Sequence, residues 1–152
     1  MKKYNYVLFD LDGTLTDSMT MWRTLRQRYV RYKGCEPEEN LDKKLAEMGW
    51  EESYDYLRKT YGIAIESDSE MYEDMKGYVA YYYKNEVALK KNVKELLGYL
   101  HGKGVKMCLA SATALELLDL ALKHCDLEKY FSKIFFRITY LTNLVNKKTY
   151  CR

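Results

Sequence analysis

The sequence predicts an α/β fold in which a parallel sheet carries an inserted helical domain. Three observations lead to this prediction. The short apolar run from Tyr4 to Phe9 is followed at once by acidic residues and a glycine, as is usual for a buried parallel strand. A long middle segment then shows only helical spacing of its apolar residues. After this segment, helix patterns alternate with strand-like runs such as Val105 to Ala110, which is typical of parallel α/β sheets.

The middle segment divides into several expected helices, because its apolar residues recur three and four positions apart. Asp17 or Ser18 is expected to cap the first helix at its N-terminus. Ser67 and Glu70 form a capping-box pattern at the start of the last one. We expect the helical insert to span residues 17–86.

The remaining elements predict a Rossmann-like core around the insert. Asn92 is expected to cap the helix that leads to the second strand, and a third strand is expected near Ile134 to Ile138. The predicted domains are a discontinuous core (1–16 and 87–138), the helical insert (17–86) and an atypical tail (139–152).

Composition limits the classes of function. With 47% hydrophobic and 31% charged residues among 152, the chain lies in the globular range. The apolar run before Asp10 is too short for a signal peptide or a membrane span, so we expect a cytoplasmic protein without a membrane partner. Four cysteines without a C-x-x-C pair indicate free thiols in a reducing compartment. Basic residues dominate positions 129–152, but no recognised binding motif accompanies them, and we expect no nucleic-acid partner.

The segment that carries chemistry is Asp10-Leu11-Asp12-Gly13-Thr14, directly after the first strand. Alternate residues of an extended chain point the same way, so Asp10 and Asp12 are expected to face one crevice beyond the strand's carboxyl end. Two carboxylates there would repel each other and a phosphate unless a cation compensates them. Hard oxygen ligands suit Mg²⁺, and Asp10 and Asp12 are the predicted metal ligands.

In such a site one carboxylate attacks phosphorus and the other exchanges a proton with the leaving group and with water. We assign Asp10 as the nucleophile, forming an aspartyl-phosphate, and Asp12 as the acid and base. Gly13 allows close backbone approach, and neighbouring N–H groups with the Thr14 hydroxyl are expected to hold phosphate oxygens. The alternative is an acidic turn after a strand, with Asp-Gly merely making the turn.

The run Asp10 to Leu15 is similar to the first motif of the haloacid dehalogenase (HAD) superfamily, and the helical insert that follows it resembles that family's cap domain. Leu109-Ala110-Ser111-Ala112-Thr113 resembles the second motif, particularly in β-phosphoglucomutase-like and phosphatase-like members. The resemblance places Ser111, and with it Ala112, at the phosphate. Helix capping by Ser111 or Thr113 is the other interpretation, and the two are compatible.

The resemblance implies a Mg²⁺-dependent phosphohydrolase or phosphotransferase that acts on a small phosphorylated metabolite, with a phosphosugar mutase as a near relative. It stops short of the family's third motif, a lysine, and fourth motif, an acidic pair, since no acidic residue follows Glu128. Lys147 and Lys148 lack the expected context and receive no role. We therefore expect an aberrant C-terminus on a gene whose intact product is longer, and an exposed sheet edge.

Other interpretations stay open at this point. A truncated, non-catalytic form that binds phosphate, or an interaction module, is the alternative to an enzyme. Tyr81-Tyr82-Tyr83 could stack on a ligand, although tyrosines at helical spacing usually cover a core edge. Trp22, with two nearby arginines, Arg23 and Arg26, could contact substrate, although a core tryptophan and solvated arginines are the commoner arrangement. Neither the substrate nor the oligomeric state is predicted.

Overall fold

The computed structural model describes residues 6–64 and 67–136. The chain divides into two compact units, a sheet unit within Met1–Ser18 and Tyr82–Arg152 and a helical unit within Met19–Tyr81. Each unit has its own buried core and is described by itself. The domain boundaries expected from the sequence stay a prediction, and the atypical tail, 139–152, lies outside the described residues.

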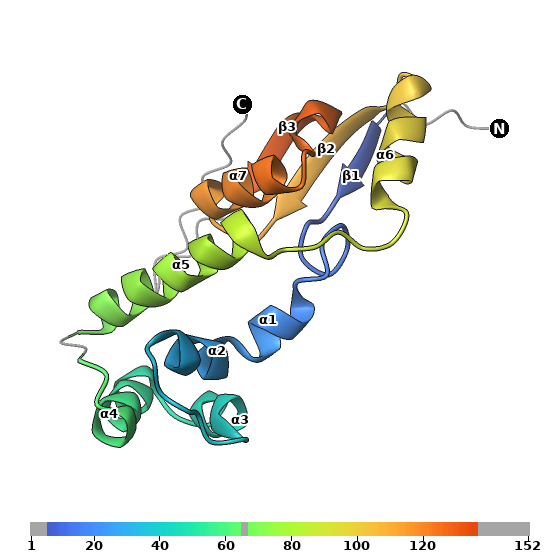
Figure 1. The fold of residues 1–152 in the computed structure, drawn as a ribbon. Helices are drawn as coiled ribbons and strands as arrows, with labels where there is room; N and C mark the ends of the chain where they lie inside the picture. Colours follow the sequence, from blue (N-terminus) through green and yellow to red (C-terminus); the bar gives the residue numbers. More distant parts are fainter. Residues whose placement is uncertain (1–5, 65–66, 137–152) are drawn as a thin grey trace. The chain divides into compact units, whose positions relative to one another are not determined.

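The sheet unit contains a three-stranded parallel sheet in the order β1-β2-β3, formed by β1 (Tyr6–Phe9), β2 (Lys106–Ser111) and β3 (Phe131–Phe136). This confirms the predicted α/β fold with a parallel sheet (Figure 1). The third strand begins at Phe131, earlier than expected, because Phe131 already has an extended backbone and its ring meets Phe9 edge-on at 6.2 Å between centroids. The expected end of that strand, at residue 138, lies outside the described residues.

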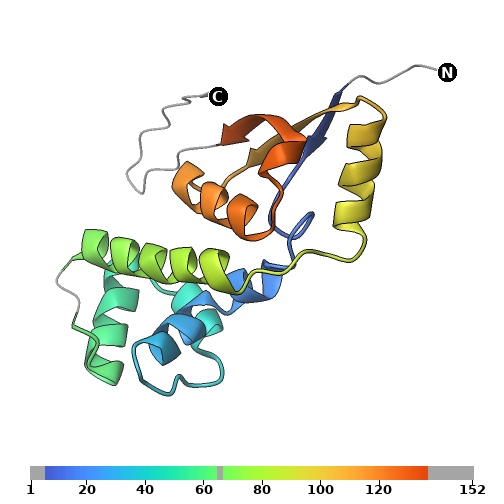
Figure 2. The same ribbon diagram turned by 45° about the horizontal axis from the view of Figure 1, so that its top comes forward.

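Two helices and one helical turn connect the strands of the sheet unit. They are α6 (Val93–Gly102), α7 (Leu115–His124) and η1 (Glu128–Tyr130). Figures 1 and 2 show α6 and α7 on the same side of the sheet. Leu97, Leu109 and Leu118 are fully buried, which places the core between these helices and the strands. Asn92 occupies the N-cap position of α6, as expected. The predicted capping by its side chain is wrong, because Asn92 has a left-handed backbone and its side chain makes no capping hydrogen bond.

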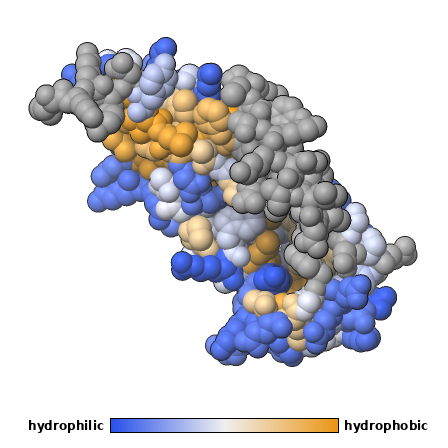
Figure 3. All heavy atoms as spheres, turned by 180° about the vertical axis from the view of Figure 1, so that it is seen from behind, coloured by the Kyte–Doolittle hydropathy of each residue, from blue (hydrophilic) through white to orange (hydrophobic). Residues whose placement is uncertain are grey.

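The outer edge of β1 carries no partner strand among residues 6–64 and 67–136. Tyr6 and Leu8 of this strand are each 63% exposed, and Figure 3 shows apolar residues gathered at this end of the molecule. An open strand edge with apolar side chains favours pairing with another strand. The burial expected of this strand from its apolar run is therefore wrong for Tyr6 and Leu8, while the exposed sheet edge expected from the C-terminal sequence stays a prediction.

The helical unit is built from α1 (Met19–Arg23), α2 (Leu25–Tyr32), α3 (Leu41–Ala46), α4 (Trp50–Tyr61) and most of α5 (Asp68–Asn85), of which the residues from Tyr82 onward belong to the sheet unit. Its core includes a set of side chains that are almost inaccessible to water: Met21, Tyr29, Val30, Leu41, Leu45, Leu57 and Met71. The Ser67 half of the capping box is confirmed, because the Glu70 N–H donates to the Ser67 hydroxyl at 3.2 Å.

The first predicted helix is broken at Thr24 into α1 and α2. The Thr24 hydroxyl donates to the Thr20 carbonyl at 2.7 Å, a bond from side chain to backbone that bends helices. The N-terminus of α2 is then capped from a distance, since the backbone N–H groups of Arg26 and Gln27 donate to the Asp42 carboxylate at 2.9 and 3.2 Å. The break is therefore stabilised by a residue of another helix.

No helix among the described residues is long and apolar enough to cross a membrane. Cys35, Cys108 and Cys125 are free thiols, while Cys151 lies outside the described residues.

A partly buried hydrogen bond joins α2 to α5 within the helical unit. The hydroxyl of fully buried Tyr29 donates to Asp74, and Lys33 forms an ion pair with the same carboxylate at 2.7 Å. Burial disfavours the Asp74 carboxylate, but the bonds from Lys33 and Tyr29 outweigh it and hold the pKa of Asp74 below its usual value. Asp74 thus stabilises the fold in its ionised form.

We expect Asp74→Ala to lower the free energy of unfolding of the helical unit by about 2 kcal/mol, because the buried Tyr29 hydroxyl loses its acceptor. The loss should be full at neutral pH and shrink as pH falls through the lowered pKa of Asp74, where the wild-type carboxylate becomes protonated. Urea unfolding at several pH values measures both effects. Asp55→Ala, which removes the exposed ion pairs with Arg58 and Lys59, is the control and should lower the free energy of unfolding much less. Equal losses in the two variants would contradict this account.

Candidate active site

Asp10 is the first residue beyond β1 and lies at the carboxyl edge of the sheet. The parallel register pairs Phe9 with Leu109, so the chain positions of Asp10 and of Ser111, the last residue of β2, are at the same edge. The Asp10 side chain is exposed, and its only hydrogen bond from the described residues is a long one, 3.5 Å, from the Thr14 hydroxyl. The predicted nucleophile is therefore accessible to a ligand.

The loop after Asp10 folds tightly around one backbone oxygen. The N–H groups of Leu15 and Thr16 donate to the Leu11 carbonyl at 2.9 and 3.0 Å, and the Thr14 N–H reaches the same oxygen at 3.3 Å. Gly13 has a φ of 77°, the left-handed region that favours glycine. The Thr14 N–H, one of the neighbouring N–H groups expected to hold phosphate, thus already has a partner within the loop.

The Asp12 carboxylate is held by three hydroxyl groups of the sheet unit, two of which are distant in the sequence. Ser18 donates to Oδ1 at 2.6 Å, Tyr83 donates to the same oxygen at 2.5 Å, and Thr113 donates to Oδ2 at 2.7 Å. Ser18 in turn contacts the buried Thr16 hydroxyl at 3.0 Å. The Thr16 hydroxyl also donates to the Leu11 carbonyl at 3.1 Å, which ties this contact to the loop. Asp12 is therefore oriented, whereas Asp10 is not.

Ser111 and its neighbours close the other side of this edge. The Ser111 hydroxyl accepts a hydrogen bond from the Thr113 N–H at 3.1 Å, which makes a local turn, and Ala112 is exposed. The alternative in which Ser111 or Thr113 caps the following helix is wrong, since Ala114 occupies the N-cap position of α7. The hydroxyl of Thr113 is used on Asp12 instead.

The two segments that connect the core with the helical insert are paired with each other. The Asp17 N–H donates to the Ala88 carbonyl and the Lys90 N–H to the Leu15 carbonyl, both at 2.9 Å. Lys90 also forms an ion pair with Asp17 at 3.2 Å. This pairing fixes the end of the Asp12 loop against the chain that follows α5.

Three residues of this arrangement were not predicted from the sequence to contact Asp12: Ser18, Tyr83 and Thr113. Ser18 was interpreted as a helix cap, but its hydroxyl donates to Asp12. Tyr83 and Thr113 are 71 and 101 residues from Asp12 along the chain, and no local pattern signals such contacts. For Thr113, its place two residues after Ser111 was the one available signal.

The oxygen donors at this edge fit a magnesium ion. Mg²⁺ in proteins often keeps several waters and is held by one or two carboxylates together with substrate phosphates. Exposed Asp10 offers such a ligand, while both Asp12 oxygens already accept hydroxyl hydrogen bonds. Within residues 6–64 and 67–136 no group of three or more His, Cys, Asp or Glu side chains is gathered for a metal. Of the two predicted ligands, Asp10 is the better placed.

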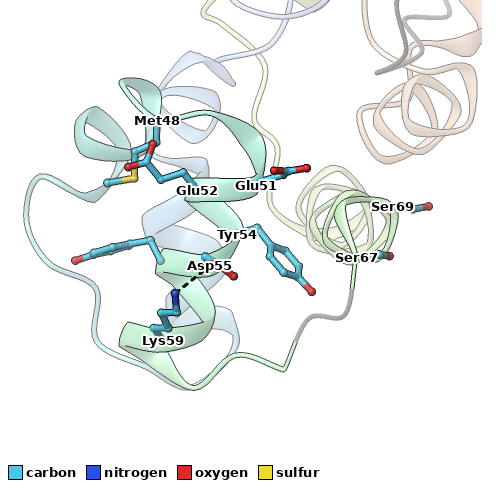
Figure 4. A pocket seen from close by; sticks show the side chains of 9 residues that line it. Met48, Glu51, Glu52, Tyr54, Asp55, Lys59, Ser67 and Ser69 are labelled. Atoms are coloured by element: carbon cyan, nitrogen blue, oxygen red, sulfur yellow. Dashed lines mark hydrogen bonds and ion pairs between the residues drawn. The ribbon is translucent and has the colours of Figure 1, made fainter.

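A hollow lies on the helical unit, between α4 and the start of α5 (Figure 4). Its lining includes three carboxylates, Glu51, Glu52 and Asp55, and a lysine, Lys59, that is paired with Asp55 at 3.1 Å. The remaining lining residues are Met48, Tyr54, Tyr56, Ser67 and Ser69. A surplus of negative charge repels phosphate, so this hollow is not a candidate for a phosphorylated ligand.

Comparison with known proteins defines the class. A family model for haloacid dehalogenase-like hydrolases matches residues 7–143. The chain belongs to the haloacid dehalogenase-like hydrolase family, which confirms the resemblance drawn from Asp10 to Leu15 and from Ser111.

Individual relatives agree with this membership. The chain is 28% identical over 134 residues, 85% of its length, to a protein of Caldanaerobacter subterraneus classed as a pyrophosphatase, PpaX. A structure from Clostridium difficile classed as a phosphatase is 28% identical, with a TM-score of 0.62 over 90% of the chain. One from Thermotoga maritima classed as a β-phosphoglucomutase is 23% identical, with a TM-score of 0.68 over 87%. The chain spans 56%, 62% and 61% of these three proteins, respectively.

Proposed function

We propose that this chain carries the site of a Mg²⁺-dependent phosphohydrolase or phosphotransferase that works through an aspartyl-phosphate on Asp10. The observation that supports this most is the contrast between two carboxylates two residues apart. Asp10 is exposed and weakly bonded, as a nucleophile needs to be, whereas Asp12 is oriented by three hydroxyl groups, as a proton-transfer group needs to be.

In the first step an Asp10 carboxylate oxygen attacks phosphorus. The bond between phosphorus and the leaving oxygen breaks, and protonated Asp12 gives its proton to that oxygen. In the second step Asp12 takes a proton from water, the water oxygen bonds to phosphorus, and Asp10 is released. A sugar hydroxyl in place of water would make the same site a mutase.

The other predicted residues would bind the transferred phosphoryl group. Gly13 leaves space at the backbone, and the hydroxyls of Thr14 and Ser111 lie at the edge where Asp10 stands. Exposed Ala112 adds backbone next to Ser111. A magnesium ion, held by Asp10 and in part by Asp12, would supply charge compensation for the phosphate. A small phosphorylated metabolite is the proposed substrate.

A second candidate function is phosphate binding without turnover. It is favoured by the finding that, within residues 6–64 and 67–136, Asp10 is not part of a group of three or more side chains that could hold a metal ion. Such a form would bind phosphate through the same loop but would not form the aspartyl-phosphate.

Phosphate release from a panel of small phosphomonoesters, measured with Mg²⁺ and after its removal by a chelator, tests the proposal. We expect turnover that the chelator abolishes and that added Mg²⁺ restores. Adding Ca²⁺ instead is the control, because Ca²⁺ takes more ligands in a looser geometry and should restore little activity. Saturable phosphate binding without turnover would instead support the second candidate. Turnover that the chelator leaves unchanged would contradict the proposed dependence on Mg²⁺.

A further inference from the structure

Tyr83 reaches the site from the C-terminal end of α5. Its side chain is fully buried, and its hydroxyl donates to Asp12 Oδ1 at 2.5 Å. The sheet unit contains both residues, although 71 positions separate them in the sequence. No step of the proposed reaction assigns a role to this tyrosine.

The three hydroxyl donors do not hold Asp12 in the same way. Ser18 lies on the chain that leaves the Asp12 loop, and Thr113 lies in the turn after β2. Tyr83 instead extends a rigid ring from a helix, and the chain after that helix pairs with residues 15–17 through the bonds of Ala88 and Lys90. The position of the Tyr83 hydroxyl is thus set by elements that also fix the loop.

Hydrogen bonds to both oxygens determine how the Asp12 carboxylate is turned. Tyr83 and Ser18 bind Oδ1, while Thr113 binds Oδ2. Loss of the Tyr83 bond would leave one donor on each oxygen and remove the donor that a helix positions, so the carboxylate would be held less firmly. Proton transfer depends on hydrogen-bond geometry between the acid and the leaving oxygen, so this weaker orientation would slow the step in which Asp12 acts.

We infer that Tyr83 is a positioning residue that orients Asp12 for proton transfer to the leaving group. This inference rests on the proposed function, in which Asp12 is the acid and base. It goes beyond that function because it links proton transfer to the end of α5, the helix that returns from the insert. The competing explanation is that Asp12 simply satisfies a buried tyrosine hydroxyl, which buried tyrosines generally require.

The leaving group of the substrate separates these explanations. A p-nitrophenolate leaves without being protonated, whereas an alkoxide needs a proton from Asp12. The ratio kcat/KM reports only steps through the first irreversible one, here transfer to Asp10, so hydrolysis of the aspartyl-phosphate does not enter it. A positioning residue therefore affects kcat/KM for alkyl phosphates selectively, while a purely structural residue affects both substrates alike.

The experiment compares Tyr83→Phe with the wild-type chain on p-nitrophenyl phosphate and on an alkyl phosphomonoester. We expect kcat/KM to fall roughly tenfold or more for the alkyl substrate, a fraction of what general acid catalysis contributes, and to stay within about threefold for the aryl one. Tyr82→Phe is the matched control, because it removes a hydroxyl from the adjacent buried ring and should change the ratio of the two substrates little. Equal losses on both substrates, or no loss on either, would overturn the inference.

An NMR measurement tests the same contact without turnover. The carboxyl ¹³C signal of Asp12 should shift in Tyr83→Phe but not in Tyr82→Phe, since the Tyr83 hydroxyl donates to that carboxylate. If the wild-type chain hydrolyses neither substrate, the proposed function and the proton-transfer part of the inference fail together, and this signal then decides whether Tyr83 orients the Asp12 carboxylate. An unchanged Asp12 signal in Tyr83→Phe would then overturn it.

Discussion

Replacing Asp10 with asparagine should abolish phosphate release, with a fall in kcat on the order of 10³ or more. An amide oxygen is a far weaker nucleophile than a carboxylate, and it cannot form an aspartyl-phosphate. Asp10 is exposed and has only a 3.5 Å contact with Thr14, so the change should leave the free energy of unfolding within about 0.5 kcal/mol of wild type. The loss would then be chemical and not a consequence of unfolding.

Two measurements check this expectation. Phosphate release gives the rate, and the intact mass of rapidly quenched wild-type protein should show an added phosphoryl group that Asp10→Asn lacks. Asp17→Asn is a matched control, because it makes the same change on an exposed carboxylate of the same segment that pairs with Lys90. Full activity of Asp10→Asn, or an equal loss in Asp17→Asn, would contradict the role of Asp10.

Elements of the fold that depend on local pattern were predictable from the sequence. The apolar run Val105 to Ala110 predicted a strand, and β2 occupies Lys106–Ser111. The break at Thr24 was not predictable, because it depends on Asp42, which is distant in sequence and caps α2 through the N–H groups of Arg26 and Gln27. Long-range hydrogen bonds of this kind leave no periodic signal in the chain.

In the candidate site, too, some residues could be predicted from local sequence and others depend on long-range contacts. Asp10, Asp12 and Gly13 are contiguous with the first strand, and their placement follows from the strand's direction and from the turn that Gly13 allows. The hydroxyls that orient Asp12 come from residues outside this motif. The sequence pattern around Tyr83 indicated only a tyrosine that covers a core edge. Only the folded positions of α5 and of the turn after β2 bring Tyr83 and Thr113 to one carboxylate.

Replacing Asp12 with asparagine is expected to lower kcat/KM for alkyl phosphates by about 10² to 10⁴, the usual contribution of general acid catalysis. The effect on p-nitrophenyl phosphate should be much smaller in kcat/KM, because its leaving group needs no proton. The fold should survive, since the amide oxygen can still accept from Ser18 and Tyr83, and the amide N–H₂ can donate to the Thr113 hydroxyl.

Hydrolysis of the aspartyl-phosphate, the second step, should also be slow in Asp12→Asn, which gives a kinetic signature that Asp10→Asn cannot show. With Asp12 unable to take a proton from water, the aspartyl-phosphate formed from p-nitrophenyl phosphate should persist. Rapid mixing would record a burst of p-nitrophenolate close to the enzyme concentration, followed by slow turnover, and the intact mass would keep the phosphoryl group. A uniform loss on both substrates without a burst would mean that Asp12 acts on the fold of the loop and not on the proton, because a structural defect does not distinguish leaving groups.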